Sequence, residues 1–160
     1  MGDIIVGIGD IKIVKGEIPL VTYALGSCVG ICVYDEGIGL GGMLHAMLPT
    51  VVDPTMIVEV DKYVDTGVVK LYNTLCRLGA DKGRLKAKLI GGAKMFEYNT
   101  SVRDADIGTL NVCKAREALK KLGVPLVREV TGGEVGRTIR FVPTSGVVTI
   151  TSTDGKTELI

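Results

Sequence analysis

The sequence predicts an α+β layered domain in which strands outnumber helices. Short β-branched and apolar runs, separated by turns rich in glycine, are typical of strands. Two other segments repeat apolar residues every three or four positions, as amphipathic helices do. Because each helix has one apolar face, both must cover a sheet. The 160 residues contain no internal repeat, linker or low-complexity segment, so we expect one domain over residues 1–160.

The amino-terminal part of the chain is predicted to form strands. Residues 4–14 are apolar with glycine punctuation and read as β structure, which Pro19 ends. Residues 28–34 and 38–45 flank the Asp-Glu-Gly turn at 35–37 and predict a β-hairpin. The hairpin brings the end of its second strand beside the start of its first.

Two helices are predicted in the middle of the chain. The first spans residues 64–78 and stops at Gly79. The second begins with Thr109 as its N-cap and runs to Leu122, before Gly123. The apolar stripe of the first helix consists of Val64, Val68, Leu71, Leu75 and Leu78.

Further strands are predicted around and after the second helix. Residues 85–90 alternate, with Lys86 and Lys88 between apolar residues, which predicts one face in the core and one in solvent. Residues 126–130, 137–142 and 147–151 are β-rich and are separated by turn sequences.

Composition argues against several classes of partner. Lysine and arginine number 19 against 18 acidic residues, a net charge of +1, so no global field favours nucleic acid or an anionic membrane. The chain has two Phe, five Tyr and no Trp, which disfavours a base-stacking surface. No apolar run approaches the roughly 20 residues of a membrane helix, so we expect no membrane insertion and a cytoplasmic protein.

The four cysteines lack Cys-x-x-Cys spacing, which suits reduced thiols rather than a disulfide framework. Cys28 and Cys32 are four apart on a predicted strand, about 13 Å by the usual rise, which is too far to share a metal ion. We therefore predict neither a metal nor another cofactor.

The strongest candidate for chemistry is the stretch from Thr22 to His45. Cys28 follows Gly26 and Ser27, and His45 is the only histidine in the chain. The predicted hairpin makes Cys28 and His45 near neighbours, which is the minimum for a thiolate nucleophile and its base. Gly26 is expected to adopt a backbone conformation closed to other residues, so that the amides around Ser27 and Cys28 face a developing oxyanion. The plainer alternatives are a buried structural cysteine, a hydrogen-bonded structural histidine and a serine that only forms the turn.

Residues 37–42 also spell the G-x-G-x-x-G pattern of dinucleotide sites. That fingerprint requires a helix directly behind it, and Pro49 follows too soon. These glycines are instead interpreted as a flexible hairpin and a place where substrate approaches the backbone.

Several short motifs of the sequence occur in the order found in a known family. They lie at residues 22–29, 34–35, 41–49, 63–66 and 90–96, at 107–108 with 111–112, and at 132–133 with 136–137, and include Gly26-Ser27-Cys28 and Gly41-Gly42-Met43-Leu44-His45. In these motifs the chain resembles CheD, the chemoreceptor glutamine deamidase of bacterial and archaeal chemotaxis. The resemblance covers nearly the whole sequence.

The resemblance implies a three-layer α/β/β sandwich with a cysteine-hydrolase-like site. It implies Cys28 as nucleophile, His45 as base and Thr22 as the third member, which accepts the other imidazole N–H through its hydroxyl or its carbonyl. It also implies a protein-glutamine glutaminase acting on methyl-accepting chemotaxis receptors, with the CheC phosphatase as regulatory partner. The same acyl-enzyme chemistry would cleave glutamyl methyl esters.

The substrate-lining residues and the competing functions are separate expectations. A receptor helix needs an apolar surface near Cys28, for which Met43, Met47 and Phe96 are candidates against ordinary core packing. One rival function is a non-catalytic chemotaxis module that docks CheC or a receptor helix. Another is a cysteine peptidase or a transglutaminase-like acyl transferase. We expect a monomer.

Overall fold

The computed structural model describes residues 2–51, 53, 55, 59–95 and 107–160, and it contains two five-stranded sheets and two α-helices. The central sheet has the order β2 (Asp10–Lys15), β5 (Leu40–Ala46), β4 (Val29–Asp35), β6 (Lys86–Gly91) and β7 (Leu126–Thr131). The outer sheet has the order β1 (Ile4–Ile5), β3 (Leu20–Leu25), β8 (Arg137–Val142), β9 (Val147–Ser152) and β10 (Thr157–Leu159).

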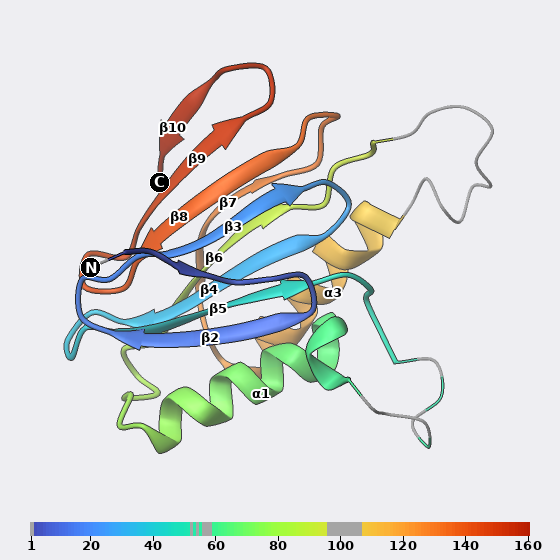
Figure 1. Cartoon of the computed structure of the whole chain (residues 1–160). Helices are drawn as coiled ribbons and strands as arrows, with labels where there is room; N and C mark the ends of the chain where they lie inside the picture. The colour runs from blue at the N-terminus through green and yellow to red at the C-terminus, as the bar shows by residue number, and fades with distance from the viewer. Residues whose placement is uncertain (1, 52, 54, 56–58, 96–106) are drawn as a thin grey trace.

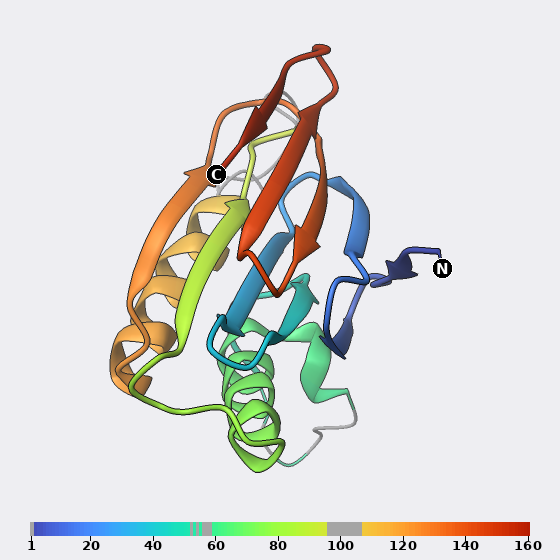
Figure 2. The same ribbon diagram turned by 90° about the vertical axis from the view of Figure 1, so that its left-hand side faces the viewer.

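The central sheet is buried on both faces. One face packs on helices α1 (Val64–Arg77) and α3 (Ile107–Leu122), and the other packs on the outer sheet. Figure 1 shows α1 running below the strands, with β8 to β10 at the top, and Figure 2 turns the same arrangement by 90°. Along β4, Ile31 lies in the helix-side core and Cys32 in the core between the sheets. The predicted α+β class is confirmed.

The predicted hairpin is confirmed. Strands β4 and β5 are antiparallel, and Gly30 pairs with His45. The turn between them is held by the buried carboxylate of Asp35, which accepts hydrogen bonds from Arg84 Nε and Nη2 at 2.9 Å each. The hairpin is therefore tied to the loop that follows α1 through a paired, buried charge.

The interpretation of the hairpin glycines as flexible and open to substrate is wrong for Gly41 and Gly42. Gly41 and Gly42 are buried in β5. A Cβ on Gly41 would lie 2.9 Å from Tyr34 Cβ, and one on Gly42 would lie 2.6 Å from Leu71 Cδ1. The missing side chain of Gly41 leaves room for the core between the sheets, and that of Gly42 leaves room for helix α1. Both glycines therefore allow the layers to pack closely.

The predicted strand at residues 4–14 is in fact two strands in different sheets. β1 pairs in parallel with β3, whereas β2 pairs in antiparallel with β5. Gly9, at φ +73°, lies where the chain passes from one sheet to the other. Both strands border buried cores, so apolar residues continue from β1 into β2. The hydrophobic pattern therefore does not reveal that the strand is interrupted.

The first predicted helix is confirmed as α1, while the start of the second was predicted wrongly. Helix α3 is described from Ile107 to Leu122, so Thr109 lies inside the helix and is not its N-cap. Gly108 allows this part of the helix to pack closely on its neighbours. A Cβ there would lie 2.6 Å from the carbonyl oxygens of both Gly92 and Ala93, so the helix is packed directly on that loop.

The solvent face predicted for β6 is also wrong. Lys88 is only 8% exposed, and its Nζ donates a hydrogen bond to the Gly146 carbonyl at 2.7 Å. The same ammonium lies 5.7 Å from the centre of the Tyr34 ring. The outer sheet covers this face, and burial lowers the pKa of Lys88. The alternating pattern indicated the strand correctly but not the second layer above it.

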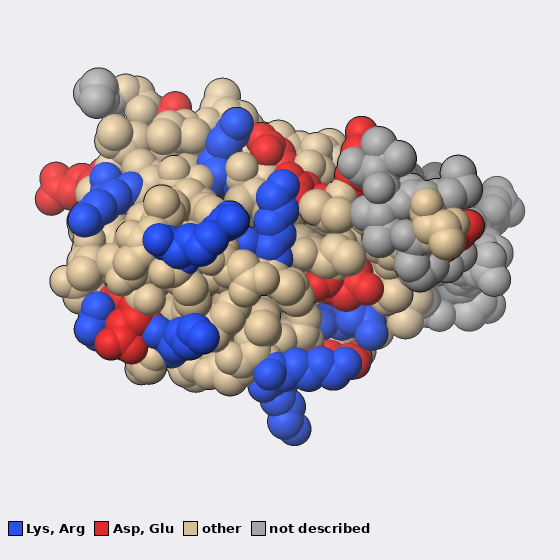
Figure 3. Space-filling model, turned by 90° about the horizontal axis from the view of Figure 1, so that it is seen from below, with Lys and Arg blue, Asp and Glu red and all other residues tan. Residues whose placement is uncertain are grey.

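The helix side of the molecule carries charges of both signs. In Figure 3, aspartate and glutamate side chains lie beside several of the lysines and arginines. Lys70 pairs with Asp61, and Lys121 pairs with Glu117. This face therefore presents mixed ion pairs rather than an extended field of one sign.

Neither α1 nor α3 is long and apolar enough to cross a membrane, and no other helix of the described residues is either.

Candidate active site

His45 lies in the interior, between the two sheets. It is on β5 of the central sheet and is 1% exposed. Its side chain reaches Thr22 on β3 of the outer sheet, and its partner across β4 is Gly30, which has no side chain. A Cβ on Gly30 would lie 2.7 Å from Ile139 Cδ1, so the space beside the imidazole is closely filled.

The hydrogen bonds of Thr22 determine which imidazole nitrogen carries the proton. Thr22 Oγ1 lies 2.6 Å from the Val6 carbonyl oxygen, which only accepts, so the hydroxyl donates there. The same Oγ1 lies 2.7 Å from His45 Nδ1. Since the hydroxyl has spent its one proton, Nδ1 must be the donor in this second bond. The neutral ring therefore keeps its lone pair on Nε2.

Nε2 of His45 is the free end of this chain of hydrogen bonds. It is buried, and no described residue gives it a partner. Burial lowers the pKa of His45 to about 4, because the site disfavours a charged ring. The imidazole is thus a neutral, oriented base at ordinary pH.

Cys28 lies at the start of the same hairpin and on the same side of the central sheet. It directly precedes β4 and packs against the core between the sheets. Since Gly30 pairs with His45, Cys28 is two residues from that pair, a diagonal neighbour with a Cα separation of about 7–8 Å in a regular ladder. Cys28 is half-buried while His45 is fully buried, so an incoming group meets the sulfur first.

Desolvation raises the pKa of the Cys28 thiol, and a hydrogen bond from its own backbone N–H opposes that shift. The resting site therefore holds a neutral thiol and a neutral imidazole. An uncharged pair of this kind gains its charges only when the thiol proton moves to Nε2 as sulfur attacks.

The turn that carries Cys28 is held by its carbonyl groups. The Gly26 carbonyl accepts from Ala93 N–H at 2.8 Å, and the Cys28 carbonyl accepts from Gly92 N–H at 2.9 Å. The Ser27 carbonyl accepts from Asn111 Nδ2 at 2.9 Å. In a trans peptide the C=O and the N–H point in opposite directions. The N–H groups of Ser27 and Cys28 therefore point away from these anchors.

The role expected for Gly26 was wrong in one respect. The left-handed residue in this region is Ala24, at φ 56°, and Gly26 is outside that range. Gly26 is needed for space, because a Cβ there would lie 3.0 Å from Met95 Cγ. A residue with a side chain would displace Met95 or shift the turn that carries Cys28.

The three methionine and phenylalanine positions proposed to line the substrate surface have different outcomes. Met43 is 0% exposed and belongs to the core between the sheets, which corrects that expectation. Its side chain points from β5 into this core, so Met43 serves core packing. Met47 is half-buried just after β5. Phe96 lies outside the described residues.

Two groups near Cys28 were not anticipated. Gly91 is the last residue of β6 and Gly92 follows it, and both lie against the turn that carries Cys28. Both have positive φ, at +114° and +68°. Asn111, on α3, is the side chain that reaches Ser27. The paired glycines after a strand were the available signal for the first group. Asn111 lies in one of the motifs shared with the known family, but that motif does not predict its contact with Ser27.

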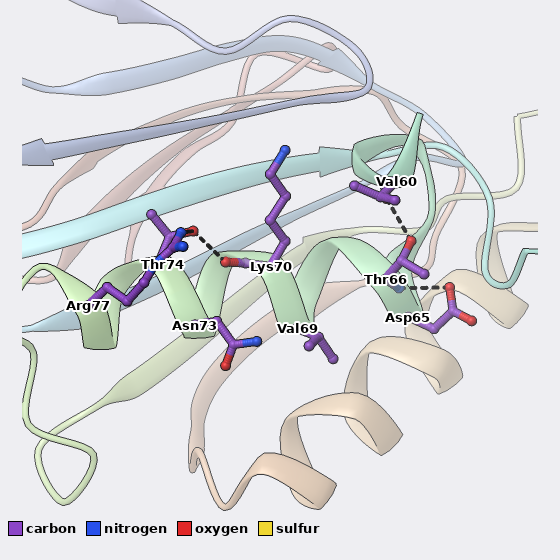
Figure 4. A pocket seen from close by; sticks show the side chains of 8 residues that line it. All are labelled: Val60, Asp65, Thr66, Val69, Lys70, Asn73, Thr74 and Arg77. Carbon is purple, nitrogen blue, oxygen red and sulfur yellow. Dashed lines mark hydrogen bonds between the residues drawn. The ribbon is translucent and has the colours of Figure 1, made fainter. Parts of the chain in front are cut away.

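A groove of about 540 Å³ runs along the outer side of α1, on the far side of the central sheet from His45. Figure 4 shows that hydroxyl groups in it are already engaged, since Thr66 donates to the Val60 carbonyl and Thr74 to the Lys70 carbonyl. The groove thus offers no oriented nucleophile and base comparable with those between the sheets. It is lined by Val60, Asp65, Thr66, Val69, Lys70, Asn73, Thr74 and Arg77.

Gly91→Ala is expected to damage the site more than a matched glycine substitution. Gly91 has φ +114°, and its Cβ would lie 2.4 Å from the Cys28 carbonyl oxygen. Gly79 has φ +109° and open space around it. Both variants bear the strain of a left-handed alanine, roughly 1 kcal/mol, but only Gly91→Ala must move the turn. Thermal melts and turnover rates of the two variants test this; equal activity would contradict it.

The stability of the protein is expected to fall as the pH drops from about 6.5 to about 4. Because the pKa of His45 is about 4 in the fold against 6.5 for the free side chain, the unfolded chain binds a proton first. Above pH 6.5 the neutral His45 makes its full contribution to the free energy of unfolding, about 3 kcal/mol. This contribution is lost as the pH falls to 4. Urea unfolding of wild type and His45→Gln across this range measures it as the difference between the two slopes. Parallel curves would contradict the prediction.

Comparison with known proteins identifies the family of this chain. Residues 47–152 match the model of the CheD family, described as CheD chemotactic sensory transduction. A protein from Pyrococcus abyssi named probable chemoreceptor glutamine deamidase CheD is 49% identical over 146 residues, 91% of this chain and 89% of that protein. A relative of the same name from Pyrococcus horikoshii is 46% identical, covering 98% and 96% of the two chains. One from Geobacter metallireducens, named probable chemoreceptor glutamine deamidase CheD 2, is 41% identical, covering 91% and 90%. This chain therefore belongs to the CheD family.

Proposed function

We propose that this protein hydrolyses glutamine side chains of chemoreceptors to glutamate, with Cys28 as nucleophile, His45 as base and Thr22 as the residue that orients the imidazole. The relatives' names supply the substrate class. The observation that supports the chemistry best is the hydrogen-bond chain from Val6 through Thr22 to His45, which leaves Nε2 as a proton acceptor on the same side of the sheet as Cys28.

The first half of the reaction forms a thioester. His45 Nε2 takes the Cys28 thiol proton while the sulfur bonds to the carboxamide carbon, and the carbonyl π electrons move to its oxygen. The N–H groups of Ser27 and Cys28 face that oxyanion. When the C–N bond breaks, the imidazolium returns the proton to the departing nitrogen, so ammonia leaves and His45 is neutral again.

The second half repeats the same proton movements with water. His45 Nε2 removes a proton from water as its oxygen attacks the thioester carbon, and the C–S bond then breaks. Sulfur recovers its proton from the imidazolium, and the product is a glutamate side chain. A methyl ester would react in the same way with methanol as the leaving group, so glutamyl methylesterase activity is part of the proposal.

Further expectations concern the setting of the enzyme. The four cysteines are free thiols, as a reducing compartment keeps them, and we place the enzyme in the cytoplasm on that basis. One catalytic domain over residues 1–160, a monomeric state and regulation by a CheC phosphatase complete the proposal. It requires no metal or cofactor, since the chemistry uses only a thiol, an imidazole and backbone amides.

Intact-mass spectrometry of a receptor cytoplasmic fragment tests the function. Deamidation adds about one dalton for each glutamine and releases one ammonia, because an NH₂ group is exchanged for OH. A peptidase would cut the fragment, and an acyl transferase would add a supplied amine such as methylamine. A binding module would leave the mass unchanged, and that result would remove the enzymatic proposal.

A further inference from the structure

The buried side chain of Asn111 joins the two segments that carry the reacting groups. Asn111 is on α3 and is fully buried. Its Nδ2 donates to the Ser27 carbonyl at 2.9 Å and to the Met47 carbonyl at 3.0 Å. Ser27 directly precedes Cys28, and Met47 lies two residues after His45. One amide group therefore links the turn of the nucleophile to the strand of the base.

The direction of this amide is unambiguous. Both neighbours are backbone carbonyl oxygens, which only accept, so the group between them must be the NH₂ end. Its two hydrogens leave the nitrogen at a fixed angle in one plane. The link therefore sets the relative position of the two carbonyl groups, and with them that of the two backbone segments.

The other end of the amide adds little to stability. Oδ1 of Asn111 is buried and has no partner among the described residues. An unpaired buried acceptor offsets much of what the two donated bonds contribute. The clear consequence of the contacts is thus geometric.

The elements around Asn111 make this link rigid. Gly108, one turn earlier on α3, packs directly on the carbonyls of Gly92 and Ala93. The N–H groups of those same two residues hold the carbonyls of Cys28 and Gly26. Helix α3 thus contacts the nucleophile turn twice, once through this loop and once through the Asn111 amide.

We propose that Asn111 is a positioning residue for the deamidation reaction, holding the Cys28 turn at a fixed place relative to the strand of His45. Asn111 acts through Cys28 and His45 and does not contact substrate. The inference rests on the function proposed above. Because proton transfer requires sulfur and Nε2 to be positioned accurately at hydrogen-bonding distance, loosening the link is expected to reduce kcat and leave KM nearly unchanged.

The test uses Asn111→Asp and Asn111→Ala in the full chain with the receptor fragment as substrate. Aspartate has the same shape, but its carboxylate cannot donate to either carbonyl. We expect kcat at pH 7.5 to fall roughly 10²-fold with KM within about twofold. As the pH is lowered towards 5.5, the buried carboxyl group gains a proton and can donate one hydrogen bond. The ratio of Asn111→Asp to wild-type kcat should therefore rise, whereas the ratio for Asn111→Ala should stay low and flat.

Leu119→Ala is the matched control. Leu119 is buried on the same helix, two turns beyond Asn111, in the core against the central sheet. It should lower the melting temperature at least as much as the Asn111 variants but keep wild-type kcat when assayed below its melting point. If Asn111→Asp or Asn111→Ala retains wild-type kcat, or loses activity only in proportion to its melting temperature, the inference is wrong. Cys28→Ala separates the two proposals, because activity in that variant would overturn the function itself.

Discussion

Replacing Cys28 by alanine is expected to abolish deamidation of a receptor fragment, lowering kcat by roughly 10⁴-fold. Without sulfur there is no thioester, and water would have to attack an unactivated carboxamide directly. His45 and the backbone N–H groups of the turn remain, so binding of the fragment should persist. The measurement is ammonia release together with the intact mass of the fragment.

Cys32→Ala is the control for that experiment. Cys32 is on β4, the strand that follows Cys28, and faces the same core, but it is fully buried, and burial raises the pKa of its thiol. The variant should lose some stability through the cavity it leaves and keep its kcat. Deamidation that survives in Cys28→Ala but disappears in Cys32→Ala would reverse the assignment of the nucleophile.

Replacing His45 by glutamine is expected to lower kcat roughly 10³-fold at pH 7. The glutamine amide can still donate to Thr22 Oγ1, so the hydrogen-bond chain to Val6 has a partner. It has no atom that accepts a proton as the imidazole does. The loss should therefore fall on kcat, and the melting temperature measured at pH 7 should show that the variant is folded.

The pH dependence of the His45→Gln variant gives a second reading. Wild-type activity should stay level from about pH 8 down to about 5 and fall as the pH nears 4, because the pKa of His45 is about 4 and protonation removes the lone pair on Nε2. The variant depends on preformed thiolate, so its rate should rise about tenfold per pH unit below the raised pKa of Cys28. A variant with more than a tenth of wild-type kcat and a level profile would exclude His45 as the base.

The layers explain why the sulfur of Cys28 is half-buried whereas the imidazole of His45 is fully buried. His45 points into the interface between the two sheets, where a neutral ring is favoured. Cys28 lies at the edge of that interface, where the strand begins. A substrate glutamine therefore needs to reach only the sulfur, while the ring is shielded from competing protons and from bulk water.

Local pattern was sufficient for much of the fold. The hairpin of β4 and β5, the helix α1 and the last strands follow from apolar periodicity and turn residues, which are properties of neighbouring positions. The candidate nucleophile and base followed from one cysteine after a glycine turn and one histidine a hairpin away. Both of these inferences need only short-range geometry.

The features that the sequence did not predict depend on which layers of the fold pack against each other. Segments distant in the chain set the burial of Lys88 and Met43, the space available at Gly26 and the close packing of α3 at Gly108. They also set the protonation of His45, because it depends on a threonine on the other sheet and on the carbonyl of Val6. The sequence determined the chemical groups and the hairpin that carries them. Only the tertiary structure decided their protonation and their supports, because burial and hydrogen-bond partners arise when sheets and helices pack, and single positions carry no record of that packing.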